Sequence, residues 1–173
     1  MKRKRIILYL AVLCLFCGCG KQKAQEPKPD PIESKTIYND FIFTLTAEKV
    51  LYTEEEAGEE EPFFYSLKME YTGNKRLLLW YRASLGYVDV MKGGKPVYKT
   101  RRLYPLKRIY LEKGSHITIT EWTGKHTEKE ANLTAGVYKV EGEIGFQIGE
   151  VYEDEPENND YVYCRLSLPL MIQ

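Results

Sequence analysis

The fold is decided by the stretch from Ile109 to Val140, which contains the segments Ile117-Thr118-Ile119-Thr120-Glu121-Trp122 and Leu133-Thr134-Ala135-Gly136-Val137-Tyr138-Lys139-Val140. Successive side chains of a β-strand point to opposite faces of the sheet, so alternation of apolar and polar residues is typical of a strand. A polar, charged connection separates the two segments. We therefore expect two strands of a β-sandwich with a long loop between them.

Other segments on both sides of this stretch have strand character. Leu77–Tyr81 is apolar without alternation, which is typical of a strand that is covered on both faces. Alternating segments lie at 37–52, 63–71, 138–147 and 162–168. We count about eight strands and no convincing helix, so the sequence predicts an all-β, antiparallel β-sandwich and not an α/β enzyme.

The most clearly predicted hairpin joins Tyr87–Lys92 to Pro96–Tyr98 through Gly93-Gly94. Two glycines permit the positive φ angles that a tight two-residue hairpin loop needs. Trp80, in the covered strand, resembles the core tryptophan of immunoglobulin-like sandwiches, here without the disulfide that it would normally pack against.

The N-terminus reads as a signal for export. Lys2 to Arg5 form a basic segment, and Ile6 to Phe16 is an apolar run that is too short to span a membrane stably. The run ends in Phe16-Cys17-Gly18-Cys19, and a small residue directly before a cysteine resembles the bacterial lipobox. We expect residues 1–18 to be a lipoprotein signal peptide and Cys19 to carry the lipid. An uncleaved anchor and an ordinary cleaved signal remain the alternatives.

The segment 19–36 follows as a lipidated flexible tether in this interpretation. It is rich in Lys, Gln and Glu, and Pro27, Pro29 and Pro31 favour an extended chain. The folded domain is then expected at 37–173. Removal of the signal leaves 21 basic against 25 acidic residues, a net charge of −4. An acidic domain is a poor ligand for nucleic acid, so we expect no nucleic-acid partner.

Cysteine usage excludes a disulfide framework. Only Cys164 remains after the signal is removed and Cys19 is modified, and a single thiol has no partner within the chain. Cys164 lies in a predicted strand, so we expect a buried cysteine. A reactive thiol, the alternative, would need a basic, exposed setting.

Three charged segments are expected to be connections. Glu54–Pro62 carries six carboxylates and is predicted to be a mobile loop, and Glu153–Asp160 is predicted to be a plain hairpin loop. Calcium binding is the alternative for both: the first segment lacks the spaced Asp and Asn ligands of a known calcium loop, whereas the carboxylates and amides of the second could hold Ca²⁺ weakly. The basic segment Thr100–Arg108 is interpreted as a solvated crossover between sheets, with a binding loop as the alternative.

No pattern points to catalysis, a cofactor or a metal ion. The two histidines, His116 and His126, lack companions at zinc-ligand spacing, and nucleophile, phosphate-binding and dinucleotide motifs do not occur. We therefore expect no catalytic, cofactor-binding or metal-binding residues. The 14 tyrosines are unusual in number, and some are expected on the surface, where tyrosine is common in interfaces and can stack on sugars.

The order of these features resembles the BsuPI family, which is named for an intracellular proteinase inhibitor of Bacillus. The resemblance runs from about Phe63 to Phe146, and it rests on the motifs Leu78–Tyr81, Ser84–Val90, Gly93–Tyr98, Leu111–Gly114, Glu121-Trp122 and Leu133–Tyr138. It implies an immunoglobulin-like β-sandwich. Here the resemblance is to a domain in an exported chain, and Tyr98 stands where the family commonly has Trp.

These observations together predict a protein of the bacterial cell envelope. It would be anchored to the membrane through lipid on Cys19 and would bind another protein, with proteinase inhibition as the most specific form of that function. The resemblance supplies the idea of inhibition, but it assigns no reactive-site residue. The alternatives are a carbohydrate or cell-wall binding module, which would use exposed Tyr and Trp, and a structural component of an envelope complex.

Overall fold

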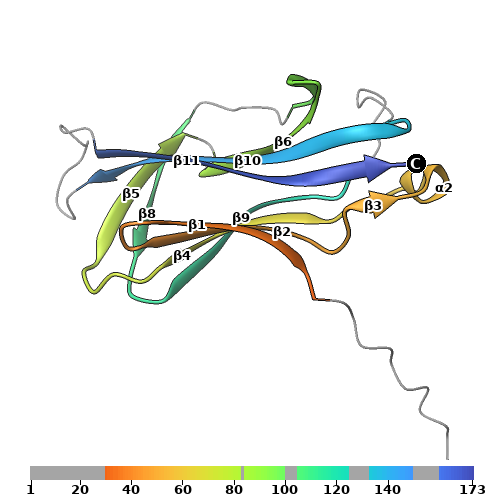
Figure 1. Cartoon of the computed structure of the whole chain (residues 1–173). Helices are drawn as coiled ribbons and strands as arrows, with labels where there is room; N and C mark the ends of the chain where they lie inside the picture. Colours follow the sequence, from red (N-terminus) through yellow and green to blue (C-terminus); the bar gives the residue numbers. More distant parts are fainter. Residues whose placement is uncertain (1–29, 83, 100–104, 125–132, 150–159) are drawn as a thin grey trace, which may run out of the picture.

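The computed structural model describes residues 30–82, 84–99, 105–124, 133–149 and 160–173. These residues form two β-sheets that face each other, as Figure 1 shows, which confirms the predicted all-β sandwich. The described elements are β1 (Ile32–Tyr38), β2 (Phe41–Ala47), β3 (Leu51–Tyr52), the short helix α2 (Glu54–Ala57), β4 (Tyr65–Tyr71), β5 (Leu77–Arg82), β6 (Gly86–Lys92), β7 (Lys95–Tyr98), β8 (Leu106–Leu111), β9 (Ser115–Trp122), β10 (Gly136–Gly149) and β11 (Asp160–Ile172).

The described residues thus contain eleven strands instead of the eight expected. Part of the difference lies at the N-terminal side, where β1 begins at Ile32, inside the segment predicted as a tether. Another part lies in the basic segment, since Leu106–Arg108 opens strand β8. The third lies at the short strand β3, whose two residues are too few for an alternation to reveal.

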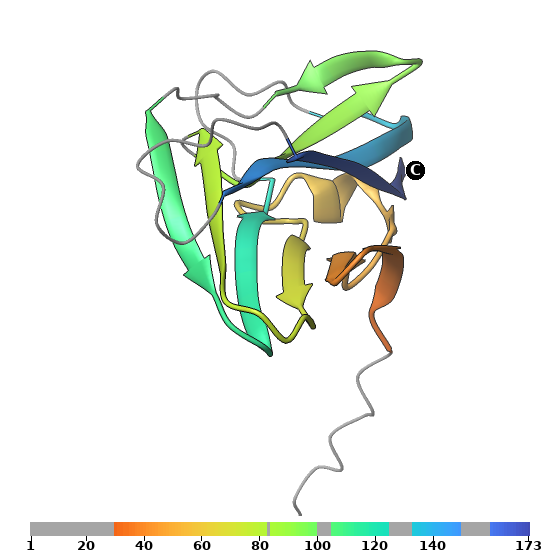
Figure 2. The same ribbon diagram turned by 90° about the vertical axis from the view of Figure 1, so that its left-hand side faces the viewer.

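The first sheet, sheet A, has the strand order β1-β2-β4-β9, and all of its pairs are antiparallel. A tight turn joins β1 to β2, with Tyr38 opposite Phe41 and Asn39 at a φ of 50°. Asn is one of the few residues with a side chain that tolerate this left-handed conformation. In Figure 2, which is turned by 90° from Figure 1, β1 lies at the outer margin of sheet A beside β2.

The second sheet, sheet B, contains the order β3-β11-β10-β5-β8, and β6 and β7 join it through pairing of β6 with β10. The two-residue pair β3–β11 is parallel, whereas the other strand pairs of the described residues are antiparallel, as predicted. The predicted hairpin β6–β7 is confirmed: Gly93 and Gly94 have φ angles of 56° and 77°. These angles are what a tight hairpin loop requires.

The long strand β10 is paired on one side by two strands in succession. It pairs with β6 over 139–144 and with β5 over 147–149. Gln147 lies opposite Trp80, whereas Gly142 lies opposite Val88, so the two registers differ by three residues. Strands β5 and β6 therefore lie one after the other along the same edge of β10, with an irregularity in the pairing between them. On its other side, β5 pairs with β8, whereas β6 pairs with β7.

The core fills the space between the sheets with aromatic rings. In β2 the side chains of Phe41, Phe43 and Leu45 are fully buried, as the alternation predicted. Phe41 contacts the ring of Phe146 from sheet B at a centroid distance of 5.1 Å, so the two sheets meet through aromatic contacts. Such pairs add to the free energy gained by burying apolar surface.

Trp122, and not Trp80, is the tryptophan of this core. Trp122 stacks on Phe63 and lies 5.6 Å from the ring of Tyr98, which joins β9 of sheet A to β7 of sheet B. Trp80 is also buried, but it does not belong to the main core cluster, although its neighbour Leu79 does. Because strand residues alternate between faces, Trp80 lies on the opposite face of β5, which corrects the comparison with the immunoglobulin core tryptophan.

Candidate binding surfaces

The outer face of β11 is the most aromatic exposed surface among the described residues. Alternation places Val162, Leu166, Leu168 and Leu170 toward the core, where they are buried. Tyr161, Tyr163 and Arg165 point the other way, and the two tyrosines keep 56% and 48% of their surface exposed. Together with Glu143 on the neighbouring strand β10, these residues form a surface that we call the tyrosine face.

Polar contacts fix the charged part of the tyrosine face. Arg165 Nη2 donates a hydrogen bond to the Tyr163 hydroxyl over 2.7 Å and lies 3.5 Å from Glu143 Oε2. The hydrogen bond with Tyr163 is the first cause that raises the pKa of Arg165, so the guanidinium stays charged. Its carbon lies 5.8 Å from the centre of the Tyr163 ring. The guanidinium is therefore held in place without a partner molecule, which lowers the entropy lost on binding.

A glycine makes room for the second tyrosine. Gly145 of β10 lies opposite Tyr163, and a Cβ atom at Gly145 would lie 2.3 Å from the hydroxyl oxygen of Tyr161. The phenol end of Tyr161 therefore lies directly over the Gly145 backbone. This contact stabilises a tyrosine that would otherwise extend freely from the sheet, and it replaces the missing side chain of the strand glycine.

The chemistry of the tyrosine face suits contact with another macromolecule. Tyr and Arg are the residues most often found at the energetic centre of protein interfaces, because they combine large apolar area with hydrogen-bonding groups. A phenol ring also offers a flat face to a sugar. Sequence alternation in Tyr161-Val162-Tyr163-Cys164-Arg165 was the signal that could have identified this surface before the structure did.

A second surface is a shallow hollow of about 380 Å³ on the outer face of sheet A. Its lining is polar and includes Glu33, Thr44, Lys68, Glu70 and His116. His116 stands opposite Glu70 in the pairing of β4 with β9. On the same face of β4, two residues before Lys68, the hydroxyl of Ser66 is fully buried and has no hydrogen-bond partner among the described residues. This surface offers hydroxyl, carboxylate and ammonium groups, and none of the described residues that line it is Phe, Tyr or Trp.

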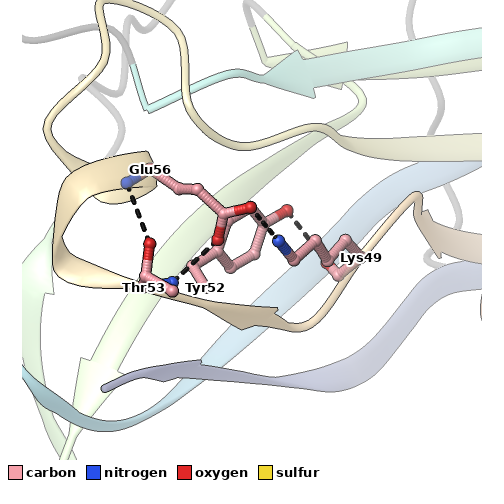
Figure 3. Close-up of polar contacts among 4 residues, drawn as sticks. All are labelled: Lys49, Tyr52, Thr53 and Glu56. Carbon is pink, nitrogen blue, oxygen red and sulfur yellow. Dashed lines mark hydrogen bonds and ion pairs between the residues drawn. The ribbon is translucent and has the colours of Figure 1, made fainter.

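The acidic segment after β3 is ordered at its start, which corrects the prediction of a mobile loop there. Glu54–Ala57 forms one helical turn, and Thr53 caps it: the Glu56 N–H donates to Thr53 Oγ1 over 3.2 Å, and the Thr53 N–H donates to Glu56 Oε2 over 2.8 Å. Figure 3 shows this reciprocal pair. The sequence Thr-x-x-Glu is the signature of such a capping box, so the signal was present.

Lys49 and Tyr52 complete this capped turn. The Lys49 ammonium forms an ion pair with Glu56, and the Tyr52 hydroxyl donates to the Lys49 carbonyl over 3.0 Å (Figure 3). The bond from Lys49 is the first cause that lowers the pKa of Glu56. Burial raises the pKa of Tyr52 to about 12. The carboxylate of Glu56 is thus already occupied by a cation of the chain itself, and we interpret this turn as structural.

The residues predicted for sites fall in different places. Cys19, His126, Arg101 and Arg102 lie outside the described residues, as does most of the second acidic segment. Cys164 lies in β11, as predicted, and is half-buried; burial raises the pKa of its thiol. Both tryptophans are buried, at 7% exposure each, so only tyrosines remain for sugar contacts that were expected to use Tyr and Trp.

The described residues contain neither a cluster of metal-binding side chains nor a membrane-spanning helix. No group of three or more His, Cys, Asp or Glu side chains in the described part of the chain is arranged to hold a metal ion. No helix within those same ranges has the length and apolar character needed to cross a membrane.

Comparison with known proteins gave no match. Neither a protein-family model, nor a curated protein, nor a solved structure matches this chain. The arguments for function therefore come from the residues and their geometry.

Proposed function

We propose that this chain is a membrane-anchored bacterial lipoprotein whose β-sandwich binds another protein through the tyrosine face. The observation that carries the binding part is the exposed pair Tyr161 and Tyr163 beside an Arg165 that is already held by Glu143. Rigid strands support these side chains, so little conformational entropy is lost when a partner covers them. The proposed role is binding and not catalysis.

The proposed anchor rests on the sequence of the N-terminus. A basic segment, an apolar run of signal-peptide length and Gly18-Cys19 are the features that support lipid attachment to Cys19. Two or more acyl chains hold a protein on a membrane stably. The protein would then act in the cell envelope, at the membrane surface.

The most specific form of this proposal is inhibition of a proteinase, and it rests on the resemblance to the BsuPI family with its immunoglobulin-like sandwich. To test it, the chain from Gly20 to Gln173 is assayed against a panel of bacterial proteases. We expect dose-dependent inhibition of at least one protease, weakened at least tenfold by Tyr163→Ala. No inhibition at micromolar concentration would remove the inhibitor form and leave a protein-binding module.

Binding through the tyrosine face is tested in cells with a photoreactive amino acid at position 163. The matched control is position 110, because Tyr110 is also an exposed tyrosine, at 40%, with an arginine, Arg76, 4.4 Å from its ring centre. We expect a protein adduct from position 163 and none from position 110. Equal adducts from both positions, or none from 163, would contradict a specific role of the tyrosine face.

Carbohydrate binding is the second candidate, and the position of Tyr161 over Gly145 is the observation that favours it. A phenol ring supported by the sheet could stack on a sugar of the cell wall. Sedimentation with purified peptidoglycan separates the candidates: retention that is lost in Tyr161→Ala would favour the sugar. If no protein is captured at position 163 but the chain co-purifies with stoichiometric partners, a structural role in an envelope complex would be favoured instead.

A further inference from the structure

Strand β1 is the margin of sheet A, and its second side is open in the described part of the chain. It pairs with β2 over all seven of its residues and with no other strand. The N–H and C=O groups of alternate residues therefore point outward along this margin, which is a template for pairing with another strand. Figure 2 shows β1 at this margin, with β2 as its neighbour.

The side chains of β1 protect this margin only in part. Ile37 is 67% exposed, and Ile32 and Tyr38 at the two ends are 38% and 46% exposed. No proline interrupts the strand, and no charged residue points toward the core: Ser34 and Thr36 face the buried Leu45 and Phe43. The charged side chains Glu33 and Lys35 oppose pairing with an unrelated apolar strand, so the edge favours a partner whose charges are complementary.

The two charged residues of β1 are placed so that two antiparallel copies of the strand can face each other with opposite charges. Glu33 and Lys35 both lie on the outer face of sheet A, opposite Thr46 and Thr44 of β2, and both are exposed. Neither forms an ion pair with another described residue. When a second β1 strand runs antiparallel with Ser34 opposite Ser34, Glu33 of each copy stands opposite Lys35 of the other.

Charge selects this register over its neighbours. A shift by two residues in one direction places Lys35 opposite Lys35, and a shift in the other direction places Glu33 opposite Glu33. Opposite charges in directly facing positions stabilise a strand pair, and like charges destabilise it. A shift by one residue would bring the outer face of one strand against the core face of the other.

We propose that two copies of this chain associate through antiparallel pairing of their β1 strands, with the two-fold axis at Ser34. The two four-stranded sheets A then form one continuous sheet across the axis. The pairing is isologous: the five residues from Ile32 to Thr36 of one copy lie opposite the same five residues of the other. The proposal is independent of the tyrosine face and of the lipid.

A second copy fits this edge better than an unrelated strand does. Backbone hydrogen bonds alone could form with any extended segment. The charges of Glu33 and Lys35, however, are complementary to the same two residues of a second, antiparallel β1 strand. If the proposed lipid on Cys19 is present, confinement of the copies to one membrane surface raises their effective concentration, so a weak contact in solution suffices. Pairing in solution does not require the lipid.

The first test uses sedimentation of the chain from Gly20 to Gln173 over a wide concentration range. We expect a reversible dimer for the natural sequence. Lys35→Glu gives two acidic residues on each strand and Glu33→Lys gives two basic ones, so each variant alone should dimerise at least about tenfold more weakly. An equimolar mixture of these two variants should restore dimers, because each Glu of one variant then stands opposite a Lys of the other.

The second test uses disulfide formation in cells that produce the full chain with Cys164→Ser. Ser34→Cys should give a disulfide-linked dimer, because residue 34 faces itself at the axis. Lys35→Cys alone should give none, but co-production of Lys35→Cys with Glu33→Cys should. The Cys164→Ser chain without a new cysteine is the control. Any disulfide-linked dimer of this chain would show that the Cys19 thiol is free. That result would count against the proposed lipid anchor, and not against the contact between the β1 strands.

Three results would overturn the proposal. The natural chain could sediment as a monomer at millimolar concentration, or Lys35→Glu could dimerise as strongly as the natural chain. The third is a disulfide between Ser34→Cys and a different protein in place of a second copy, which would mean that the edge binds a strand of another protein.

Discussion

The indole of Trp122 stacks on the ring of Phe63, with 5.3 Å between ring centroids and 16° between ring planes. This contact joins the end of β9 to the segment that leads into β4, and the Phe63 N–H donates to the Thr123 carbonyl over 3.0 Å. Gly124 also lies against the Phe63 ring: a Cβ atom there would lie 2.2 Å from a carbon of that ring. The stack therefore depends on a glycine just after β9.

Gly124→Ala should destabilise the domain strongly. Gly124 has a φ of +71°, which costs an L-residue about 1–2 kcal/mol, and the new methyl group would displace the Phe63 ring at a further cost of about 1–3 kcal/mol. Gly114→Ala is the matched control, because Gly114 has a φ of +80° and nothing within 4 Å of a Cβ position. Urea unfolding measures both. Equal losses of free energy would show that the Phe63 contact contributes nothing.

Thr53→Ala should lower the free energy of unfolding by about 1 kcal/mol, within a range of about 0.5–2 kcal/mol. The Thr53 hydroxyl accepts the Glu56 N–H at the start of the helical turn, and alanine leaves that donor without its partner. Glu55→Ala, in the same turn, is the control and should change the value by less than about 0.5 kcal/mol. If the two variants are equally stable, the capping box is not a stabilising feature.

Acid should weaken the domain through Glu56. The pKa of Glu56 is lowered from its usual 4.5, first by the bond from Lys49 and then by the Thr53 N–H. A lowered pKa contributes stability above the pKa of the unfolded chain, and this contribution is lost as the pH falls through the folded value. Lys49→Met should therefore make the melting temperature less dependent on pH between about 6 and 3. Parallel curves for the two proteins would argue against the link.

Cys164 should react slowly with iodoacetamide in the folded chain. Burial raises the pKa of its thiol, and the thiolate is the form that reacts. In the chain from Gly20, where it is the only thiol, labelling at neutral pH should be several-fold slower than in urea. Ser167→Cys with Cys164→Ser places the thiol at an exposed position of the same strand and should label quickly. Similar rates at both positions would mean that burial does not protect Cys164.

Cys19→Ala should release the protein from the membrane. The proposed lipid attaches through this sulfur, and without it no acyl chains hold the protein at the membrane surface. Fractionation of cells should find the variant in the soluble fraction, while Cys17→Ala stays with the membrane. A membrane-bound Cys19→Ala protein would refute the proposed lipidation site.

Strong alternation made part of the fold predictable. Phe41, Phe43 and Leu45 repeat with period two, and all three are in the core; Gly93-Gly94 could only be read as a tight turn. Such signals work because burial on one face and positive φ angles each demand a particular residue type. The Thr53–Glu56 capping box and the outward tyrosines of β11 were equally visible in the sequence.

Other features depend on neighbours that the sequence does not name. Strand β1 has Ser34 and Thr36 on its core side, so its pattern resembles that of the polar chain before it. Trp80 and Trp122 are both buried, and only the pairing of their strands decides which one lies between the sheets. The parallel pair β3–β11 joins Leu51 to Met171, and such distant pairing has no local signal.

The three-residue offset between the registers of β5 and β6 on β10 has a consequence for changes in chain length. Each of the two strands is held by its own ladder, so an insertion or deletion between Arg82 and Gly86 would not slide either one along β10. Such a change would act instead on the junction itself, where Leu85 is buried in the core and its carbonyl accepts from the Gly145 N–H over 2.9 Å, so its cost would fall on this one residue while both halves of the sheet keep their native alignment.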